Sequence, residues 1–483
     1  MNKQDGIFER RNELKSVFWI LAGVLIVITL LFPGDAPWIN DEPILIYTAF
    51  TYNQQGIFPG HGIYGSIGIP YGPLPIWFYK CLLFFSKDLI FIVFLKALLT
   101  LSVVFLSLYF IAKKLNLSTY PLLLPLASPY LYLYSRTLWD ICFLIPISIL
   151  LMLCLVKLID THRLSWFSAC LFSMVCLIHI HLISMLIVIP FFIFLILFEW
   201  KWLLKHLKNL SLLIIVFLCS LIPYAKLVLT KSAVSMESSM TDTWYNWLAP
   251  VKIFSFWGFD NYFAPEMLTK DYVLPGDLYI LLKYLTGLAF VFFVIGFIII
   301  TLNLWTKIRK KMALTTEENF SAFCLITIVF SILFFIASRI SFHPQYSNIV
   351  CFAYFFIIYS CLKLYWQNKI VRCAFWAYFL SMLFLLISFS FYIHMAGGNR
   401  GIHYGATLKN QIAIVNQINS FHSKSPIYAY VDNLKMFPHE FHALQALYGK
   451  SDELRQNNPL KKIKVVYKNN DKTGWLTLDI SDK

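Results

Sequence analysis

Long apolar runs dominate the chain and are separated by short polar segments. Residues 17–32, 210–229, 278–302 and 375–392 are examples of such runs. Each is near or above the ~18 to 20 residues that a helix needs to cross the hydrocarbon core of a membrane. The pattern therefore predicts membrane-spanning helices.

Placing spans between the polar segments predicts about eleven helices. We expect them at residues 16–33, 88–111, 119–135, 141–158, 165–180, 182–199, 210–229, 277–304, 319–337, 347–365 and 373–393. Residues 76–87 fit either an interfacial helix or an extension of the second span. The first run is longer than the apolar part of a signal peptide, about 7 to 15 residues, so we interpret it as a retained anchor.

Three segments are then expected on the far side of the membrane, at residues 34–86, 230–276 and 394–483. The second carries aromatic residues beside polar ones, which suits a lid or an amphipathic loop at the interface, with a sugar platform as the alternative. In the third, the pattern predicts a helix at 408–418 and strands at 427–431, 464–467 and 475–478. The sequence thus predicts an all-α polytopic membrane domain, residues 1–393, and a small extracytoplasmic α/β domain, residues 394–483.

Composition and charge support this interpretation. The chain is 59% hydrophobic and 13% charged, whereas a soluble domain is about half apolar and roughly one quarter charged. The formal net charge is +15, but the basic residues gather in alternating loops, at 113–114, 163, 201–208, 307–311 and 369–372. Because basic loops stay cytoplasmic, the charge sets an orientation and gives no indication of a nucleic-acid partner.

This orientation predicts a multi-pass protein of the bacterial inner (plasma) membrane, with its N-terminus in the cytoplasm and its C-terminus outside. The ten cysteines lie in or beside apolar runs. The sequence therefore offers no disulfide framework and no spaced pair of metal ligands.

Acidic residues in the first outer segment are the leading candidates for chemistry. Asp41 and Glu42 come directly before Pro43, where a helix to about Tyr52 is expected. Capping of that helix explains an acid at this position without any catalytic role. Asp140, at the outer end of a membrane hairpin, is a second acid on the same face, and a charge at that depth is costly unless it is paired or functional. A shared site is therefore one reading and separate structural roles are the other.

Further elements surround these acids along the first two hundred residues. They are Tyr71-Gly72-Pro73-Leu74-Pro75, Lys96, and Ser128-Pro129-Tyr130-Leu131-Tyr132-Leu133-Tyr134-Ser135-Arg136 followed by Asp140. Together with the acidic pair, these elements resemble the polytopic C-superfamily (GT-C) glycosyltransferases, which include protein O-mannosyltransferases and the lipid A aminoarabinose transferase. The resemblance covers roughly residues 16–200. Some relatives carry a Lys where this chain has Gly72, so another basic group must contact the donor phosphate.

The resemblance implies transfer of a hexosyl or pentosyl group from a polyprenyl-phosphate donor to a hydroxyl of an envelope glycan, lipid or protein, with inversion. It implies that Asp41 is the general base, and that Glu42 and Asp140 orient it or hold a cation. A divalent metal is compatible with these carboxylates, but nothing further specifies one. The partners it implies are the donor, the acceptor and membrane lipids.

Other residues are candidates for substrate binding. They are Tyr71, Lys80, Arg136, His181, Arg339, His343 and Tyr346. His181 also fits a buried hydrogen-bonding role. Arg339 also fits an arginine that extends to the membrane surface, and His343 a helix cap.

Two other functions are consistent with many spans. A transporter or flippase for lipid-linked sugars is one, although transporters commonly show repeated halves and broken helices at matched positions, and the sequence shows neither. A non-catalytic assembly subunit that keeps the fold is the other.

Overall fold

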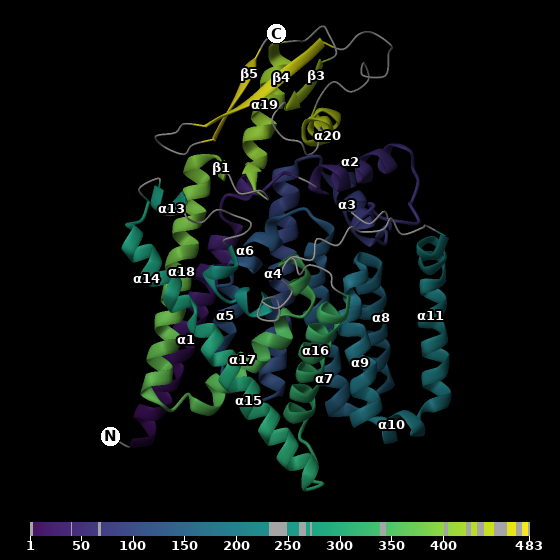
Figure 1. Ribbon diagram of the computed structural model, residues 1–483, viewed down its shortest axis with the longest axis vertical. Helices are drawn as coiled ribbons and strands as arrows, with labels where there is room; N and C mark the ends of the chain where they lie inside the picture. The colour runs from purple at the N-terminus through teal and green to yellow at the C-terminus, as the bar shows by residue number, and fades with distance from the viewer. Residues whose placement is uncertain are drawn as a thin grey trace.

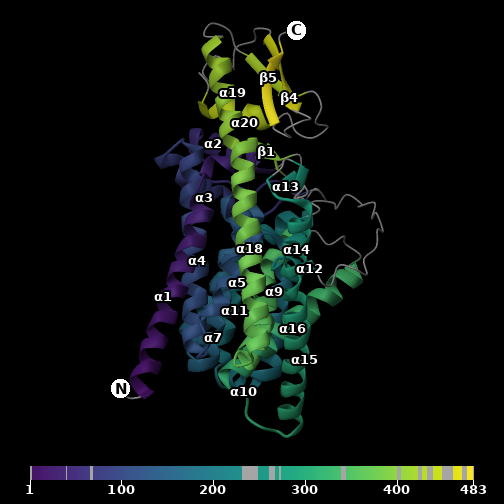
Figure 2. The ribbon, with the colours of Figure 1, turned by 90° about the vertical axis from the view of Figure 1, so that its left-hand side faces the viewer.

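The structure is a computed structural model. It describes residues 3–39, 41–65, 69–230, 249–259, 267–270, 273–338, 344–399, 404–421, 427–431, 439–448, 461–469 and 476–481. Helices run along the long axis of the molecule, with the N-terminus at one end and the C-terminus at the other (Figure 1). A three-stranded sheet lies beyond the end of the long helices that is opposite the N-terminus, as the side view shows (Figure 2).

Long helices form the body of the protein. They are α1 (Lys3–Leu30), α4 (Leu89–Lys114), α7 (Leu144–Thr161), α8 (Leu164–Ile180), α9 (Met185–Phe198), α11 (Leu207–Thr230), α14 (Gly276–Thr286), α15 (Leu288–Arg309), α16 (Thr316–Ser338), α17 (Cys351–Tyr365) and α18 (Lys369–Ala396). In the described part of the chain, five helices are long and apolar enough to cross a membrane by length and composition, and α1, α8, α9, α11 and α17 include shorter apolar stretches. Helices occur at each predicted span, while the number that crosses the bilayer stays a prediction.

Short helices connect these spans. They are η1 (Pro33–Asp35), α2 (Asp41–Gln54), α3 (Leu74–Phe85), η2 (Tyr120–Leu122), α5 (Leu123–Leu126), α6 (Pro129–Arg136), η3 (Asp140–Phe143), η4 (Leu182–Ser184), α10 (Trp200–Lys205), α12 (Ala249–Lys252), η6 (Phe256–Phe259), α13 (Met267–Lys270) and η7 (Pro344–Ile349). The prefix η marks a 3₁₀ helix.

Local chemistry explains where two of these elements begin. The Asp88 side chain accepts hydrogen bonds from the N–H groups of Ile90 and Phe91 and so caps α4. Helix α3 therefore ends as a separate element before α4 starts and is not an extension of the second span. Helix α2 begins at Asp41, two residues before the predicted start at Pro43.

The predicted helix at 119–135 is interrupted. Residues Pro121, Pro125 and Pro129 divide it into η2, α5 and α6. Proline lacks an N–H and fits the first turn of a helix better than its interior, so each short element begins at or near one of these prolines. The break leaves α6 as a short helix whose last residue, Arg136, lies just before Asp140.

The tail adds β1 (Gly398–Asn399), β2 (Gly405–Ala406), α19 (Leu408–Phe421), β3 (Ile427–Val431), α20 (His439–Tyr448), β4 (Lys461–Asn469) and β5 (Leu476–Ser481). Strand β3 pairs with β4 in parallel, and β4 pairs with β5 antiparallel. Helix α19 and strands β3, β4 and β5 overlap the helix and strands that the sequence predicts, whereas β1, β2 and α20 were not predicted. Whether residues 394–483 fold as a separate domain stays a prediction.

A buried ionic cluster fixes the start of the tail to the ends of two long helices. Asp35, just after α1, is 1% exposed. Its carboxylate lies 2.7 Å from the His394 ring at the end of α18 and 3.3 Å from the Lys409 ammonium on α19. The Tyr404 hydroxyl donates to the Asp35 carbonyl. Helix α20 then packs against α2, so the tail lies directly over the first outer segment.

Candidate active site

Two acids from distant parts of the chain meet at the outer end of the bundle. Asp41 is the first residue of α2 and Asp140 is the first residue of η3, and these two elements pack together. The carboxylates interact electrostatically. Asp41 is partly exposed, whereas Asp140 is 1% exposed. The structure therefore brings together the two acids that the sequence places on one face.

The Asp41 carboxylate has one hydrogen-bonding side chain beside it, that of Trp139. Burial raises the pKa of the Asp41 carboxyl above its ordinary value, and the hydrogen bond from Trp139 lowers that pKa by less. A carboxylate with a raised pKa takes up a proton closer to ambient pH, which suits a general base. The Trp139 indole, which directly precedes Asp140 in the chain, thus stabilises the ionised carboxylate of Asp41 on helix α2.

Asp140 is held by only one of its two carboxylate oxygens. Oδ1 accepts a hydrogen bond from the Ile141 N–H at 2.7 Å. Oδ2 is buried and has no hydrogen-bond partner in the part of the chain that the structure describes. A buried oxygen without a partner costs about 1 to 3 kcal/mol. This atom is therefore available to a substrate group or to another ligand.

A buried lysine lies behind the acids. Lys96 on α4 is 1% exposed, and its ammonium donates to the carbonyls of Tyr134 at 2.8 Å and Ser135 at 3.1 Å. It also interacts electrostatically with Glu42, which is 4% exposed. Because helix carbonyls in the last turn have no partner within the helix, Lys96 caps α6 and links it to the start of α2.

Arg136 donates to protein groups on two sides. Its guanidinium donates to the Tyr132 hydroxyl and to the Phe32 carbonyl, and it lies 4.8 Å from the centre of the Tyr132 ring. Nε is buried without a hydrogen-bond partner among the described residues. Helix α6 ends at Arg136 and Asp140 begins η3, so the two residues do not share one continuous helix. The backbone therefore does not place Arg136 and Asp140 four residues apart on one helix, where they could form an ion pair.

Aromatic rings from three connecting segments come together, and one of these segments, η7, packs against η3, which carries Asp140. The Tyr71 ring lies 4.2 Å from the His181 ring, centre to centre, and Tyr346 of η7 lies 6.1 Å from His181 on another side. Burial lowers the pKa of His181 to about 3, so its ring is neutral. Its Nδ1 accepts a hydrogen bond from the Ile183 N–H at 3.1 Å. His181 therefore has the buried hydrogen-bonding role, and a substrate contact stays a prediction.

Gly72 shows why this chain cannot carry the lysine of some relatives at this position. A Cβ at Gly72 would lie 2.1 Å from the His179 carbonyl oxygen at the end of α8, far inside contact distance. Lys80, the nearest basic residue on α3, is 4% exposed. Its ammonium donates to the carbonyls of Tyr52 and Ile57, each at 2.8 Å. These bonds tie α3 to the end of α2, and a role for Lys80 at the donor phosphate stays a prediction.

Comparison with known proteins gives a likeness at the level of structure. No protein-family model matches the chain, and no curated protein sequence does. Among solved structures, ArnT from Cupriavidus metallidurans in the apo state has 12% identity and a TM-score of 0.53, covering 95% of this chain and 93% of that one. ArnT bound to undecaprenyl phosphate has 13% identity and a TM-score of 0.50, covering 94% and 93%.

ArnT is the lipid A aminoarabinose transferase, a GT-C enzyme. The chain shares the fold of ArnT. The resemblance seen over residues 16–200 is therefore confirmed for the fold, and it extends over nearly the whole chain. Together with the long apolar helices, this fold makes the protein a multi-pass membrane protein.

Some expected parts of the GT-C site lie outside the described residues. Arg339 and His343 are among them, as are residues 231–248 of the second outer segment. Within the described ranges, no three His, Cys, Asp or Glu residues lie close enough together to hold a metal ion.

Two residues of the site were not singled out as functional from the sequence. Trp139 stands directly before Asp140 in the chain, but its hydrogen bond to Asp41 depends on how α2 meets η3. Tyr79, on α3, is fully buried and interacts electrostatically with Glu42 and Asp140. In the sequence, Tyr79 is recognisable only as a polar ring within an apolar helix. This feature alone does not distinguish a site residue from a core residue.

Proposed function

We propose that this protein is a membrane glycosyltransferase that moves a sugar from a polyprenyl-phosphate donor to an acceptor hydroxyl on the extracytoplasmic face. The observation that carries the proposal is the meeting of Asp41 and Asp140 at the outer end of a GT-C fold. The structural neighbour bound to undecaprenyl phosphate supports a lipid-phosphate donor. The acceptor class is an envelope glycan, a lipid or a protein.

The chemistry is one inverting displacement. The acceptor oxygen attacks the anomeric carbon of the sugar while Asp41 takes the hydroxyl proton. The bond between that carbon and the phosphate oxygen breaks, and the lipid phosphate leaves with the electron pair. Phosphate is a stable anion, so its departure needs no strong acid. Asp41 ends the step protonated and returns its proton to solvent.

The neighbouring groups hold Asp41 in place for this step. Trp139 donates a hydrogen bond to its side chain. Burial, and then the nearby charge of Asp41, raise the pKa of the Asp140 carboxyl well above its ordinary value, which favours a proton on Asp140 and leaves Asp41 as the ionised base. Glu42, anchored near Lys96, fixes the first turn of α2.

The leaving phosphate requires cations. Lys80 and Arg136 already donate to protein groups, and the Arg136 Nε is the buried donor that remains without a described partner. We assign the phosphate to Arg136 and Arg339, and the cover of the site to His343 and Tyr346 of the late outer loop. Tyr71 and His181 form the wall beside Tyr346.

The orientation follows from the charge pattern. We place the protein in the inner membrane, with its N-terminus in the cytoplasm and the tail on the outer side, where Asp41 and Asp140 also lie. The two termini lie at opposite ends of the bundle (Figure 1), as this orientation requires. The sugar is a hexosyl or pentosyl group.

The test is sugar transfer by purified Asp41→Asn protein. We expect the variant to fold and to lose about 10²- to 10⁴-fold in rate, the usual effect of a general base. The matched control is Asp88→Asn, which changes an acid of the same outer face that caps α4 and keeps its capping ability. Full activity of Asp41→Asn with a polyprenyl-phosphate donor would remove the proposed base.

A flippase for lipid-linked sugars is the rival function. It would move the donor across the bilayer and leave the bond between sugar and phosphate intact. Analysis of the lipid product separates the two, because a transferase releases free polyprenyl phosphate. Release that depends on Asp41 supports the transferase, and movement of intact donor supports the flippase.

A further inference from the structure

A short helix lies crosswise at the end of the molecule that carries the N-terminus. This helix, α10 (Trp200–Lys205), connects the end of α9 to the start of α11, and it runs across the direction of both (Figure 1). Because the long helices cross the bilayer, a helix that runs crosswise at their ends lies along the membrane surface. Amphipathic helices that bind lipid headgroups lie in this position.

Contacts on one side fix α10 to the bundle. Trp202 is buried, and its indole N–H donates to the His162 carbonyl at the end of α7, at 2.9 Å. Its ring also packs edge-on against Phe167 of α8, 5.9 Å from centre to centre. Glu199, directly before α10, lies 3.0 Å from the His162 ring, and it is the only acid between residues 161 and 236. One side of α10 is therefore held by the protein, and the other side is turned outward.

Two rows of side chains cover the outward side of α10. Lys201 and Lys205 are exposed and stand four residues apart, where side chains on a helix are neighbours. Trp200 is 50% exposed and Leu204 is 61% exposed, and they form a second row with the same spacing. An α-helix turns by about 100° per residue, given 3.6 residues per turn. The row of lysines therefore borders the row of apolar side chains.

The first turn of α11 extends both kinds of surface, because Leu207 and Lys208 are also exposed. In the part of the chain that the structure describes, Lys201, Lys205 and Lys208 have no acidic side chain within ion-pair distance. A lysine can lay its apolar stem along such a surface and keep its ammonium in the polar layer, and Trp is common at membrane interfaces. The segment thus combines unpaired positive charges with exposed apolar groups.

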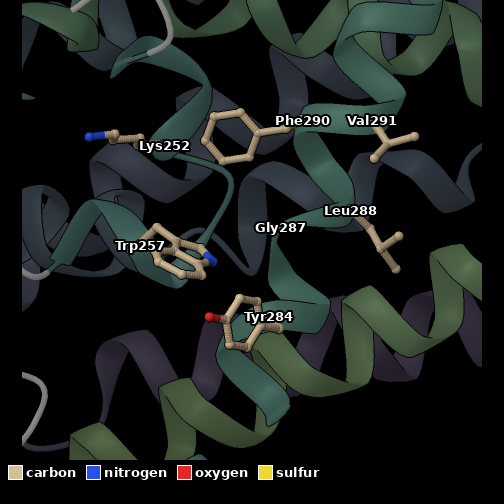
Figure 3. Close-up of a pocket in the computed structure, with 7 residues that line it drawn as sticks. All are labelled: Lys252, Trp257, Tyr284, Gly287, Leu288, Phe290 and Val291. Atoms are coloured by element: carbon tan, nitrogen blue, oxygen red, sulfur yellow. The ribbon is translucent and has the colours of Figure 1, made fainter. Parts of the chain in front are cut away.

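A pocket elsewhere in the protein lacks this combination. It lies at the junction of α14 and α15, has a volume of about 390 Å³ and is lined mainly by aromatic and aliphatic side chains. Figure 3 shows the rings of Trp257, Tyr284 and Phe290 around it, while the ammonium of Lys252 points away from them. The pocket therefore offers apolar surface without an adjoining charge, whereas α10 holds both kinds of side chain in neighbouring rows.

We propose that α10 and the first turn of α11 form a surface that binds anionic phospholipids of the adjoining membrane leaflet. The lysines contact the acidic headgroups, and Trp200, Leu204 and Leu207 insert among the upper parts of the acyl chains. The positive charges select an acidic headgroup, and the apolar row selects a lipid in a bilayer over a free phosphate. In the orientation that we propose, this leaflet is the cytoplasmic one. The inference is independent of sugar transfer, because it uses neither Asp41 nor any residue near it.

The experiment uses the full-length protein in phosphatidylcholine vesicles that contain a small fraction of a photoactivatable lipid. Two probes with the same diazirine-bearing chain are compared, phosphatidylglycerol and phosphatidylcholine. Peptides produced with pepsin are mapped by mass spectrometry, and the measure is the ratio of labelling by the two probes within residues 199–209. We expect phosphatidylglycerol to label this segment more strongly, and unlabelled phosphatidylglycerol to compete with it.

Charge variants test which residues make the surface. A lysine near the membrane surface adds about fivefold to the binding of an acidic lipid, so Lys201→Gln/Lys205→Gln should lower the ratio at 199–209 by about 25-fold. Lys201→Arg/Lys205→Arg should retain it, because the charge is kept. The matched control is Lys310→Gln/Lys311→Gln, which removes two exposed lysines that follow α15 and should leave the ratio at 199–209 unchanged.

Four results would overturn the proposal. They are equal labelling of 199–209 by the two probes, a ratio unaffected by the double glutamine variant, an equal fall of the ratio in the control variant, and loss of labelling on addition of glycerol phosphate, which has the charge of a headgroup and no chain. Unchanged elution of every variant in size-exclusion chromatography confirms that a lower ratio reflects lost lipid binding.

Discussion

Replacing Lys96 by Met should destabilise the protein strongly, because this buried ammonium serves two partners at once. It donates to the carbonyls of Tyr134 and Ser135, and it interacts with the charge of Glu42. Methionine keeps the length of the stem and its packing. The substitution therefore removes the charge and the two hydrogen bonds while changing the volume of the core little.

The structure supplies a control of the same kind. Lys80 is also a buried lysine that donates to two backbone carbonyls and lies over an aromatic ring, 4.8 Å from the centre of Phe58. Lys96 lies over Phe143 at 5.5 Å. Lys80 interacts electrostatically with the Cys81 thiol and Lys96 with the Cys142 thiol, and Lys96 interacts in addition with Glu42. The difference between the two substitutions therefore reports mainly on the interaction of Lys96 with Glu42.

The expected magnitudes differ accordingly. Lys80→Met leaves buried carbonyls without their donor and should cost about 1 to 3 kcal/mol. Lys96→Met also removes a positive charge that interacts with Glu42, and the loss of a neighbour coupled in this way should add about 0.5 to 3 kcal/mol. Adding Glu42→Gln to Lys96→Met should recover part of the loss, as coupled neighbours show interaction energies of about 0.5 to 3 kcal/mol.

Thermal unfolding in detergent can be followed with a thiol-reactive dye. Cys142 is a free, buried cysteine beside Lys96, so the dye reaches it when this region opens. Because membrane proteins commonly unfold irreversibly, the half-life at a fixed temperature is the measure. A difference of about 2 kcal/mol in the barrier corresponds to about 30-fold in rate. Equal half-lives for Lys96→Met and Lys80→Met would refute the coupling to Glu42.

Two further predictions concern the neighbours of the acids. Trp139→Phe removes the hydrogen bond that lowers the pKa of Asp41, so this pKa should rise and activity should fall off at a higher pH on the acid side. The pH profile of kcat/KM measures the shift, and an unchanged or lower acid limb would contradict it. Gly72→Ala places a Cβ 2.1 Å from the His179 carbonyl and should cost about 1 to 3 kcal/mol in stability. Gly60→Ala, with nothing within 4 Å, should melt like the unchanged protein, and an equal loss in both would exclude the clash.

The positions of the helices could be predicted from the sequence because lipid imposes one simple requirement. A span must be apolar over its length and must satisfy its own backbone hydrogen bonds, so apolar runs map directly onto helices. The exact first residue of each helix depends on local contacts that the apolar runs do not reveal. The helix at 41–54 begins before Pro43 because acidic residues also fit the first turn of a helix. The break in 119–135 could have been predicted only by giving the three prolines more weight than the apolar pattern.

The candidate site was only partly predictable, and the reason is its origin in tertiary packing. Asp41 and Asp140 could be placed on one face from the topology, because hydropathy sets which ends of the spans share a side. Their contact depends on how α2 packs against η3, and so does the hydrogen bond from Trp139 to Asp41. The cap that Lys96 places on α6 joins residues about forty positions apart, and no spacing rule of a single helix relates them.

Comparison of three outer acids shows why two of them, and not the third, suit chemistry. Asp35, Asp41 and Asp140 each lie in the first turn of a short helix, where an acid is stabilised by free N–H groups. Asp35 lies within ion-pair distance of two basic side chains, His394 and Lys409, which ties the tail to the bundle. In the described part of the chain, Asp140 has a buried oxygen without a partner, and Asp41 has a neutral indole beside it. A partly buried acid with a neutral neighbour and a second carboxyl group beside it gains a proton readily. The ionic partners, more than the position at the membrane surface, therefore separate the structural acid from the pair to which we assign sugar transfer.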